Sequence, residues 1–281
     1  MSSWNDKIES LRIKFALKGK EPIDAQELIR KAIIQFGEQL TVSWSAGACS
    51  TVVLHMAWKL NPEIKVVLCD TTQLYPQDIY YMRKMRDEWN LNLTVTKPIK
   101  PFWKVWREYG APTIRRQYYH GVKKYGKNRH TFQEKTGKPA CCWFCKDKPF
   151  LDFCKKENIQ ATFTGIRCSE SVARMYYAQD YGQWHFTKRQ KLWKVNPILF
   201  WTNKQVQNYF IENHLPKNEV YTKLGLKRNG CMPCTGFIGW RKQLSKVNPK
   251  MLKFVLKTFG ETQIEDFIIQ ENEGCKPELG V

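Results

Sequence analysis

The sequence predicts an α/β fold in which a parallel twisted sheet is flanked by helices, with helical additions at both ends of the chain. Short apolar runs alternate with longer segments of helical periodicity, as in the strand at 64–70 and the helix at 76–89. A loop of small residues follows one of these strands and leads directly into a helix. Strands that alternate with helices imply right-handed crossovers, and these produce a parallel sheet.

The first half of the chain supplies most of this pattern. An amphipathic helix is expected over 23–37 and ends at Gly37. The run LTVSWS predicts a buried strand, which continues through SAGACS into the helical run TVVLHMAWKL. The pattern then repeats in a strand, a helix and a strand, at 64–70, 76–89 and 91–98.

The second half is less regular. Residues 101–140 are basic and aromatic without clean periodicity, and we interpret them as a loop with short helices over the crevice, serving as a lid or an anion-contacting arm. A further strand, QATFTGIR, ends at Arg167. Strand, turn and helix follow at 193–214, and the tail at 248–270 is expected to be helical.

Length and charge limit the architecture and the partners. The 281 residues favour one main domain at 38–240, with an N-terminal helical extension at 1–37 and a helical tail at 241–281. No apolar stretch would span a bilayer, and the N-terminus lacks the apolar core of a signal peptide, so we expect a soluble cytoplasmic protein. The formal charge of +20 predicts an anionic partner.

The loop at 43–51 is the main candidate anion site. It joins a strand to a helix N-terminus, where free amides and the helix dipole favour negative charge. Because the carboxyl ends of parallel strands share one edge, we expect the next strand's Asp70 in the same crevice. The alternative is an ordinary tight turn. The candidate binding residues here are Ser43, Ser45, Gly47, Ser50 and Asp70.

The cysteines predict a metal centre. Ten cysteines in a chain of intracellular character favour thiolates that serve metals or chemistry over disulfides. Cys141 and Cys142 are adjacent, while Cys231 and Cys234 form a distant Cys-x-x-Cys pair, so a folded domain must bring four thiolates to one soft metal. Cys145 offers an alternative, because it completes a second Cys-x-x-Cys pair of the spacing that holds structural zinc.

Five segments in order carry a family resemblance. They are the loop at 43–51, CDTTQLYPQ at 69–77, CCWFCKDKP at 141–149, GIRCSESVAR at 165–174 and RNGCMPCTG at 228–236. Together they resemble the adenylyl-sulfate and phosphoadenylyl-sulfate reductase family of assimilatory enzymes. The fold of this family resembles that of the adenine nucleotide alpha hydrolases. The resemblance spans roughly residues 38–240.

The resemblance implies an activity and its cofactor. It implies reduction of adenylyl sulfate (APS) to sulfite and AMP, or of the 3'-phosphorylated substrate (PAPS) to sulfite and adenosine 3',5'-bisphosphate. The implied reductant is thioredoxin or a comparable dithiol, and the implied assembly is a dimer. The widely separated cysteine pairs resemble those of family members with a [4Fe-4S] cluster, whose ligands here would be Cys141, Cys142, Cys231 and Cys234.

The resemblance also implies roles for basic and nucleophilic residues. Arg167 and Arg174 match positions that face sulfate and phosphate, and guanidinium groups bind such oxyanions in bidentate fashion. Lys146 matches a lysine near the cluster. Cys275 would be the nucleophile that attacks sulfur, while Cys49 at a helix N-terminus is a second candidate. Weaker anion-contacting candidates are Arg115, Arg116 and Arg228.

Some residues of the anion loop differ from those of related enzymes, so two other functions are also considered. Ala48 and Cys49 replace the lysine and aspartate of loops that cleave ATP, which disfavours pyrophosphatase chemistry, and Ala46 puts the usual loop geometry in doubt. One alternative is an iron–sulfur sulfurtransferase that modifies tRNA or DNA, since basic and aromatic residues interleave as in polyanion-binding proteins. Another is a non-catalytic nucleotide-binding regulator.

Overall fold

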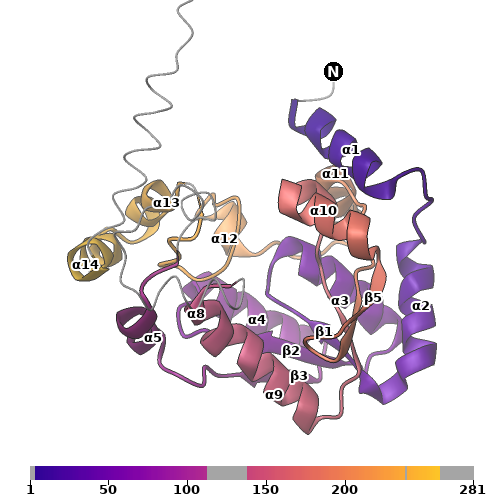
Figure 1. Cartoon of the computed structure of the whole chain (residues 1–281), viewed down its shortest axis with the longest axis horizontal. Helices are drawn as coiled ribbons and strands as arrows, with labels where there is room; N and C mark the ends of the chain where they lie inside the picture. The colour runs from indigo at the N-terminus through magenta and orange to yellow at the C-terminus, as the bar shows by residue number, and fades with distance from the viewer. Residues whose placement is uncertain (1–3, 113–137, 238, 260–281) are drawn as a thin grey trace, which may run out of the picture. The chain divides into compact units, whose positions relative to one another are not determined.

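The computed structural model describes residues 4–112, 138–237 and 239–259 (Figure 1). It divides into two compact, discontinuous units, which are treated separately below. Unit 1 comprises Met1–Asp70, Tyr75–Lys97 and Pro149–Asn229, and unit 2 comprises Thr71–Leu74, Pro98–Lys148 and Gly230–Val281. The predicted division at 37/38 and 240/241 stays a prediction. Three predicted site residues, Arg115, Arg116 and Cys275, lie outside the described residues.

Unit 1 contains a six-stranded sheet in the order β3-β2-β1-β4-β6-β5. The strands are β1 (Leu40–Ser43), β2 (Lys65–Cys69), β3 (Leu93–Thr96), β4 (Ala161–Phe163), β5 (Trp184–Thr187) and β6 (Leu192–Val195). All neighbours are parallel except β5, which pairs antiparallel with β6 at one edge. The predicted α/β class with a parallel sheet is confirmed, and the antiparallel edge strand is an addition to it.

The strand order creates one topological switch point. In the centre of the sheet Val42 of β1 lies between Val66 of β2 and Phe163 of β4. The chain leaves β1 towards β2 and β3 and later returns to the other side of β1 with β4. Loops that leave the carboxyl ends of β1 and β4 therefore diverge to opposite sides, and ligands bind at such a crevice.

Helices flank this sheet (Figure 1). Those in unit 1 are α1 (Trp4–Leu17), α2 (Ala25–Phe36), α3 (Ala48–Leu60), α4 (Pro76–Glu88), α9 (Lys148–Lys156, from its second residue), α10 (Val172–Tyr181), α11 (Asn203–Glu212) and α12 (Glu219–Thr222). Phe150 and Phe153 of α9 form a buried cluster with Val67 of β2 and Leu192 of β6. Burying aromatic rings in this way stabilises the α/β layers by the hydrophobic effect.

Local signals explain several helix boundaries. The Asp24 side chain caps α2 by accepting hydrogen bonds from the first-turn amides, and Gly37 ends it with a φ of 49°. Thr202 and Gln205 form a reciprocal capping box at the start of α11. The helix expected over 23–37 is thus confirmed as α2. None of the described helices is long and apolar enough to cross a membrane.

Unit 2 is helical and has its own core. It contains α5 (Phe102–Tyr109), α8 (Ala140–Cys142), a π-type turn (Trp143–Asp147), α13 (Trp240–Val247) and α14 (Pro249–Phe259). Their buried side chains include Phe102, Trp106, Trp240, Leu244 and Val255. The predicted helical tail is therefore observed as far as residue 259, and its remainder lies outside the described residues. Most of the predicted lid, at 113–137, also lies outside them.

Candidate functional site

The loop between β1 and α3 has two consecutive carbonyl oxygens held by asparagine side chains. The Nδ2 of Asn229 donates to the carbonyl oxygen of Ser45 at 2.7 Å. The Nδ2 of Asn218 donates to the carbonyl oxygen of Ala46 at 3.0 Å in a buried hydrogen bond. Both asparagines come from the segment around α12, more than 170 residues away along the chain. The loop is therefore fixed by tertiary contacts as well as by its own sequence.

Ser50 and Tyr221 fix the rest of the loop. The Oγ of Ser50 accepts from the amide of Ser45 at 3.2 Å and donates to the carbonyl oxygen of Gly47 at 3.0 Å. The hydroxyl of Tyr221 accepts from the amide of Ala48 at 3.4 Å. Ser45, Gly47 and Ser50 were predicted as binding residues, and the structure gives Ser50 a clear role in shaping the loop.

The remaining amides of the loop have no partner. Ala46 and Gly47 are buried, and their amides and that of Cys49 make no hydrogen bond within the described parts of the chain. A buried donor without a partner is costly and calls for a ligand or water. Because these donors lie at the N-terminus of α3, where the helix dipole is positive, the loop is suited to an anion.

Ala46 adopts the left-handed conformation, with a φ of 58°. This conformation costs a residue with a side chain about 1–2 kcal/mol, which glycine would avoid. The loop therefore has alanine at a position where the left-handed backbone conformation favours glycine. Gly47 follows it, and a Cβ there would lie 2.9 Å from the Oδ1 of Asn229, so a larger residue would displace the asparagine side chain from its present position.

The loop after β4 packs closely against the start of α3. A Cβ on Gly165 would lie 2.5 Å from the amide nitrogen of Ser50 and 2.7 Å from the carbonyl carbon of Cys49. Such distances are excluded, so glycine is required for the two loops at the switch point to meet. This contact brings the segment GIRCSESVAR to the anion loop.

Arg167 is buried in this junction, with 5% of its surface exposed. Its Nε donates to the Sγ of Cys49 at 3.2 Å, and its Nη1 donates to the Oγ of Ser169 at 3.0 Å and to the carbonyl oxygen of Trp201 at 3.3 Å. Nη1 also lies 3.3 Å from a carboxylate oxygen of Glu9 in α1. Its Nη2 makes no hydrogen bond to a described residue, which leaves this donor for an anion.

Arg174 lies near Cys49, and Arg228 lies near Arg174. Arg174 forms an ion pair with Glu170, whose other oxygen is 3.6 Å from the Nε of Arg167. Partial burial lowers the pKa of Arg174, the positive charges of Arg228 and Arg167 lower it further, and Cys49 acts in the opposite direction. The structure thus assembles the three predicted arginines of unit 1 around the N-terminus of α3.

Asp70 and Ser43 end neighbouring strands of the sheet. Ser43 is the last residue of β1, and Asp70 follows β2. The carboxylate of Asp70 is 2.6 Å from the Nζ of Lys97. This pairing offsets the negative charge of Asp70 at the edge of the sheet where the anion loop begins.

All four predicted metal-binding cysteines belong to unit 2. The thiol of Cys141 donates to the sulfur of Cys142, and this hydrogen bond lowers the pKa of Cys142 and raises that of Cys141. The cation of Lys146 lowers the pKa of Cys142 further. The negative charge of Cys231 also raises the pKa of Cys141, so the two cysteine pairs interact electrostatically.

The second pair sits in a tight turn. The amide of Cys234 donates to the carbonyl oxygen of Cys231 at 3.1 Å, and the Sγ of Cys231 is 3.2 Å from the Oγ1 of Thr71. Cys145, the residue of the zinc alternative, is 1% exposed, and burial raises the pKa of its thiol to about 12. Its sulfur lies 3.9 Å from the carbonyl oxygen of Lys100. In this structure Cys145 is therefore a protonated thiol that packs in the core of unit 2.

The donor set fits a soft iron–sulfur group. Across the described residues no three His, Cys, Asp or Glu side chains converge on one ion position. In a cluster each cysteine binds a different iron, so its ligands need not converge. The buried indole N–H of Trp106 lies beside the thiol of Cys141 and opposes the rise in its pKa. A donor of this kind beside Cys141 suits a thiolate that carries charge.

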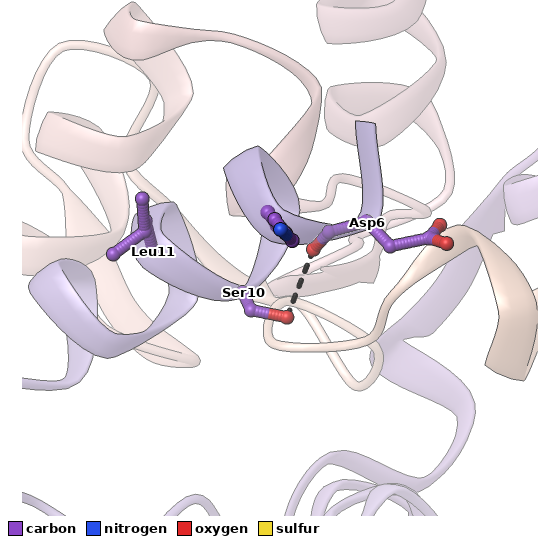
Figure 2. A pocket seen from close by; sticks show the side chains of 4 residues that line it. Asp6, Ser10 and Leu11 are labelled. Carbon is purple, nitrogen blue, oxygen red and sulfur yellow. Dashed lines mark hydrogen bonds between the residues drawn. The ribbon is translucent and has the colours of Figure 1, made fainter. Parts of the chain in front are cut away.

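A separate open hollow of about 390 Å³ lies on α1 (Figure 2). It is lined by Asp6, Lys7, Ser10 and Leu11, and the hydroxyl of Ser10 donates to the carbonyl oxygen of Asp6 at 2.9 Å. None of the predicted site residues lines it.

Several residues of the site were not predicted. Asn218, Asn229 and Tyr221 hold the anion loop, and Glu9 holds Arg167. Single asparagines and glutamates in polar surroundings give no pattern that a sequence can reveal. The only local signal is the position of Asn218 as the capping residue of α12, where its Oδ1 accepts from the amide of Val220.

A buried anion loop at the switch point of a parallel sheet defines a nucleotide-binding α/β protein. Residues 39–237 match the family model described as the phosphoadenosine phosphosulfate reductase domain. The chain belongs to the phosphoadenosine phosphosulfate reductase family.

Similar proteins are named as one of two kinds of sulfonucleotide reductase. The chain is 26% identical over 194 residues to the phosphoadenosine 5'-phosphosulfate reductase of Vibrio parahaemolyticus, covering 69% of this chain and 65% of the relative. It is 27% identical over 224 residues to the adenosine 5'-phosphosulfate reductase of Pseudomonas aeruginosa, covering 78% and 74%. The chain thus spans just under two thirds of the length of the first relative and about three quarters of the second.

A solved structure agrees on the fold. The phosphoadenylyl-sulfate reductase of Candida auris, solved as a phosphate complex, superposes with a TM-score of 0.54 at 21% identity. The match covers 82% of this chain and 97% of the other. It confirms the predicted fold class.

Proposed function

We propose that this protein is a cytoplasmic sulfonucleotide reductase of sulfate assimilation. It converts PAPS or APS to sulfite and adenosine 3',5'-bisphosphate or AMP, and a thioredoxin-type dithiol supplies the electrons. The observation that carries the proposal is the anion loop, where carbonyl oxygens are bound from within the protein and the amides of Ala46, Gly47 and Cys49 have no partner in the described chain. Family membership supports it, and a homodimer is proposed on the family resemblance alone.

The arginines complete an oxyanion site. The Nη2 of Arg167 is available at the junction of the two loops, and Arg174 and Arg228 add positive charge beside Cys49. Fixed donors of this kind bind a phosphate or sulfate group without reorganisation. The absence of a loop lysine matters less for this chemistry than for ATP cleavage, because no pyrophosphate leaves.

The proposed reaction has two steps. A cysteine thiolate attacks the sulfate sulfur, an S–S bond forms, and the S–O bond to the nucleotide phosphate breaks, which releases the nucleotide and leaves a cysteine S-sulfonate. A thiolate of the dithiol then attacks the cysteine sulfur and releases sulfite, and its second thiol completes a disulfide. We propose Cys275 as the nucleophile, with Cys49, whose sulfur accepts a hydrogen bond from Arg167, as the alternative.

Cys141, Cys142, Cys231 and Cys234 would hold a [4Fe-4S] cluster, and the alternative is structural zinc held by Cys142, Cys145, Cys231 and Cys234. When bound, the cluster would link the two cysteine pairs through iron–thiolate bonds. Lys146 would place a cation beside Cys142 and offset negative charge there, as its effect on the pKa of Cys142 indicates. Trp106 would direct an indole N–H towards the charged sulfur of Cys141.

The test is a search for the covalent intermediate. Cluster-loaded protein is incubated anaerobically with APS or PAPS without reductant, and intact and peptide masses are measured. The expected result is a sulfo adduct on Cys275 or Cys49 that thioredoxin removes as sulfite, and the better substrate settles the question of the 3'-phosphate. A cluster-loaded protein that forms no adduct with either nucleotide would refute this mechanism and favour nucleic-acid sulfur transfer or a regulatory role.

A further inference from the structure

Asn218 links the anion loop to a buried carboxylate. Its Nδ2 donates to the carbonyl oxygen of Ala46 at 3.0 Å and to the Oδ1 of Asp78 at 2.7 Å, while its Oδ1 accepts from the amide of Val220 at 2.9 Å. An amide nitrogen has two protons, so these two acceptors use both of them. The side chain is 2% exposed, and its orientation is fully determined by its three partners.

Asp78 is the buried carboxylate at the end of this chain of hydrogen bonds. It lies in the first turn of α4 and is 1% exposed. Its Oδ2 is buried without a hydrogen-bond partner among the described residues, while its Oδ1 accepts from Asn218. A buried carboxylate with one oxygen unsatisfied carries a cost in stability. Such a cost is consistent with a role in the site, because strain and unsatisfied groups concentrate at functional positions.

Asp78 does not contact the anion loop directly. Its effect passes through Asn218 to Ala46, the residue held at a φ of 58°. A left-handed residue persists only where its surroundings determine it. Removing the acceptor on Asp78 would free Asn218 to rotate and would release the carbonyl oxygen that fixes this peptide.

We propose that Asp78 is a positioning residue that, through Asn218, orients the peptide of Ala46 and thereby the unpartnered amides of the anion loop. The proposal deepens the reductase function and rests on it for its catalytic consequence, but its structural part stands on the contacts alone. Asp78 touches neither the loop backbone nor, by its burial, a bound anion. It acts by holding the donors in place before the substrate arrives.

The first test does not depend on activity. Hydrogen exchange of the amides in 44–51 is measured by mass spectrometry in the full chain without nucleotide. D78A and N218A are both expected to exchange several-fold faster there than the wild type, because local opening becomes easier. D78N should exchange like the wild type, since its amide oxygen can still accept from Asn218. D87A is the matched control, because Asp87 is an exposed residue of the same helix.

The second test measures catalysis with whichever of APS and PAPS the wild type reduces. D78A should raise KM, and the Kd for the nucleotide product, about tenfold, equivalent to about 1.4 kcal/mol, with kcat little changed. D78N and D87A should keep the wild-type KM. A D78A/N218A double variant should lose no more than the worse single variant, since both act through one contact.

The outcomes distinguish a failure of the positioning role of Asp78 from a failure of the proposed reductase function. Unchanged exchange at 44–51 in D78A and N218A would overturn the positioning role, whatever the activity. Faster exchange with an unchanged KM would also overturn it, since the loop would then not need Asp78 to bind. A wild type that reduces neither sulfonucleotide would refute the proposed function, while the exchange result would still decide the structural part. If D78A does not fold, D78L, which also removes the acceptor but fills the buried volume, provides the same comparison.

Discussion

At the scale of single residues, Gly165 decides whether the two loops at the switch point can meet. Replacing it with alanine would place a Cβ 2.5 Å from the backbone nitrogen of Ser50, an atom that cannot move without displacing α3. We expect G165A to lower the free energy of unfolding by about 1–3 kcal/mol, as overpacked sites do. Binding of the nucleotide product should also weaken, because the amides at the start of α3 would shift.

Urea unfolding and calorimetric titration with AMP check this prediction. G236A is a suitable control, since a Cβ on Gly236 would meet its nearest neighbour, Pro112, at an ordinary contact distance of 3.4 Å. Equal stability and equal affinity for G165A and the wild type would show that the loops are not packed as described.

Asp78 makes stability depend on pH. Burial raises its pKa from 3.8 to about 6, while the hydrogen bond from Asn218 and the nearby side chain of Asn229 act in the opposite direction. The folded state therefore binds this proton more tightly than the unfolded state does. The free energy of unfolding falls as the pH rises from about 4 to about 6, by a total of about 3 kcal/mol, and this contribution is constant above that range.

D78N removes the titrating group and keeps the side-chain volume. The difference in unfolding free energy between D78N and the wild type should shift in favour of D78N by about 3 kcal/mol between pH 4 and pH 7. Denaturant unfolding at several pH values measures it. Parallel pH profiles for the two proteins would contradict the raised pKa of Asp78.

At the scale of elements, α1 supports the arginine at the switch point. Glu9 contacts Arg167 at 3.3 Å, and its other oxygen accepts from the amide of Asn203 at 2.9 Å at the start of α11. Arg12 donates to the carbonyl oxygen of Ser169 at 2.7 Å. The N-terminal extension is thus packed onto the segment that follows β4.

The E9A substitution would remove one of the two carboxylates that pair with the buried guanidinium of Arg167. We expect the free energy of unfolding to fall by roughly 1–3 kcal/mol, less than for an isolated buried pair because Glu170 remains nearby. Thermal and urea unfolding measure the effect. E21A, at an exposed position between α1 and α2, should change stability little, and a loss as large in E21A as in E9A would contradict this role of Glu9.

Periodicity predicted the elements well where a chain segment carries its own signal. The alternation from β1 to β3 follows from apolar runs, and α2 follows from its buried stripe and its Asp24 cap. The strand β5 was missed because it is short and only half buried, and its pairing with β6 comes from tertiary structure.

The site was only partly predictable, because several of its contacts also join residues that are distant in the sequence. Gly165 and Arg167 lie in a motif, whereas the bond from Asn218 to Asp78 joins residues 140 positions apart.

At the scale of the whole molecule, the cysteines distinguish the two metal assignments. If a [4Fe-4S] cluster is held as proposed, C141S should abolish iron binding and the visible absorption, while C145S should retain both. Structural zinc held by Cys142, Cys145, Cys231 and Cys234 predicts that C145S loses zinc, that C141S retains it, and that no variant contains iron or absorbs visible light.

Metal analysis of anaerobically purified variants, together with absorption spectra, measures this difference. C154S serves as a control, because Cys154 is buried in the sheet cluster of unit 1. Loss of iron in C145S with full retention in C141S would contradict the proposed ligand set.

The two units are interleaved along the chain. The polypeptide passes from one to the other five times, at 70/71, 74/75, 97/98, 148/149 and 229/230. No single cut, by a protease or in a gene, can therefore separate the anion loop from the cysteine pairs and leave each half intact. A gene fragment that encodes one unit completely must therefore also encode segments of the other.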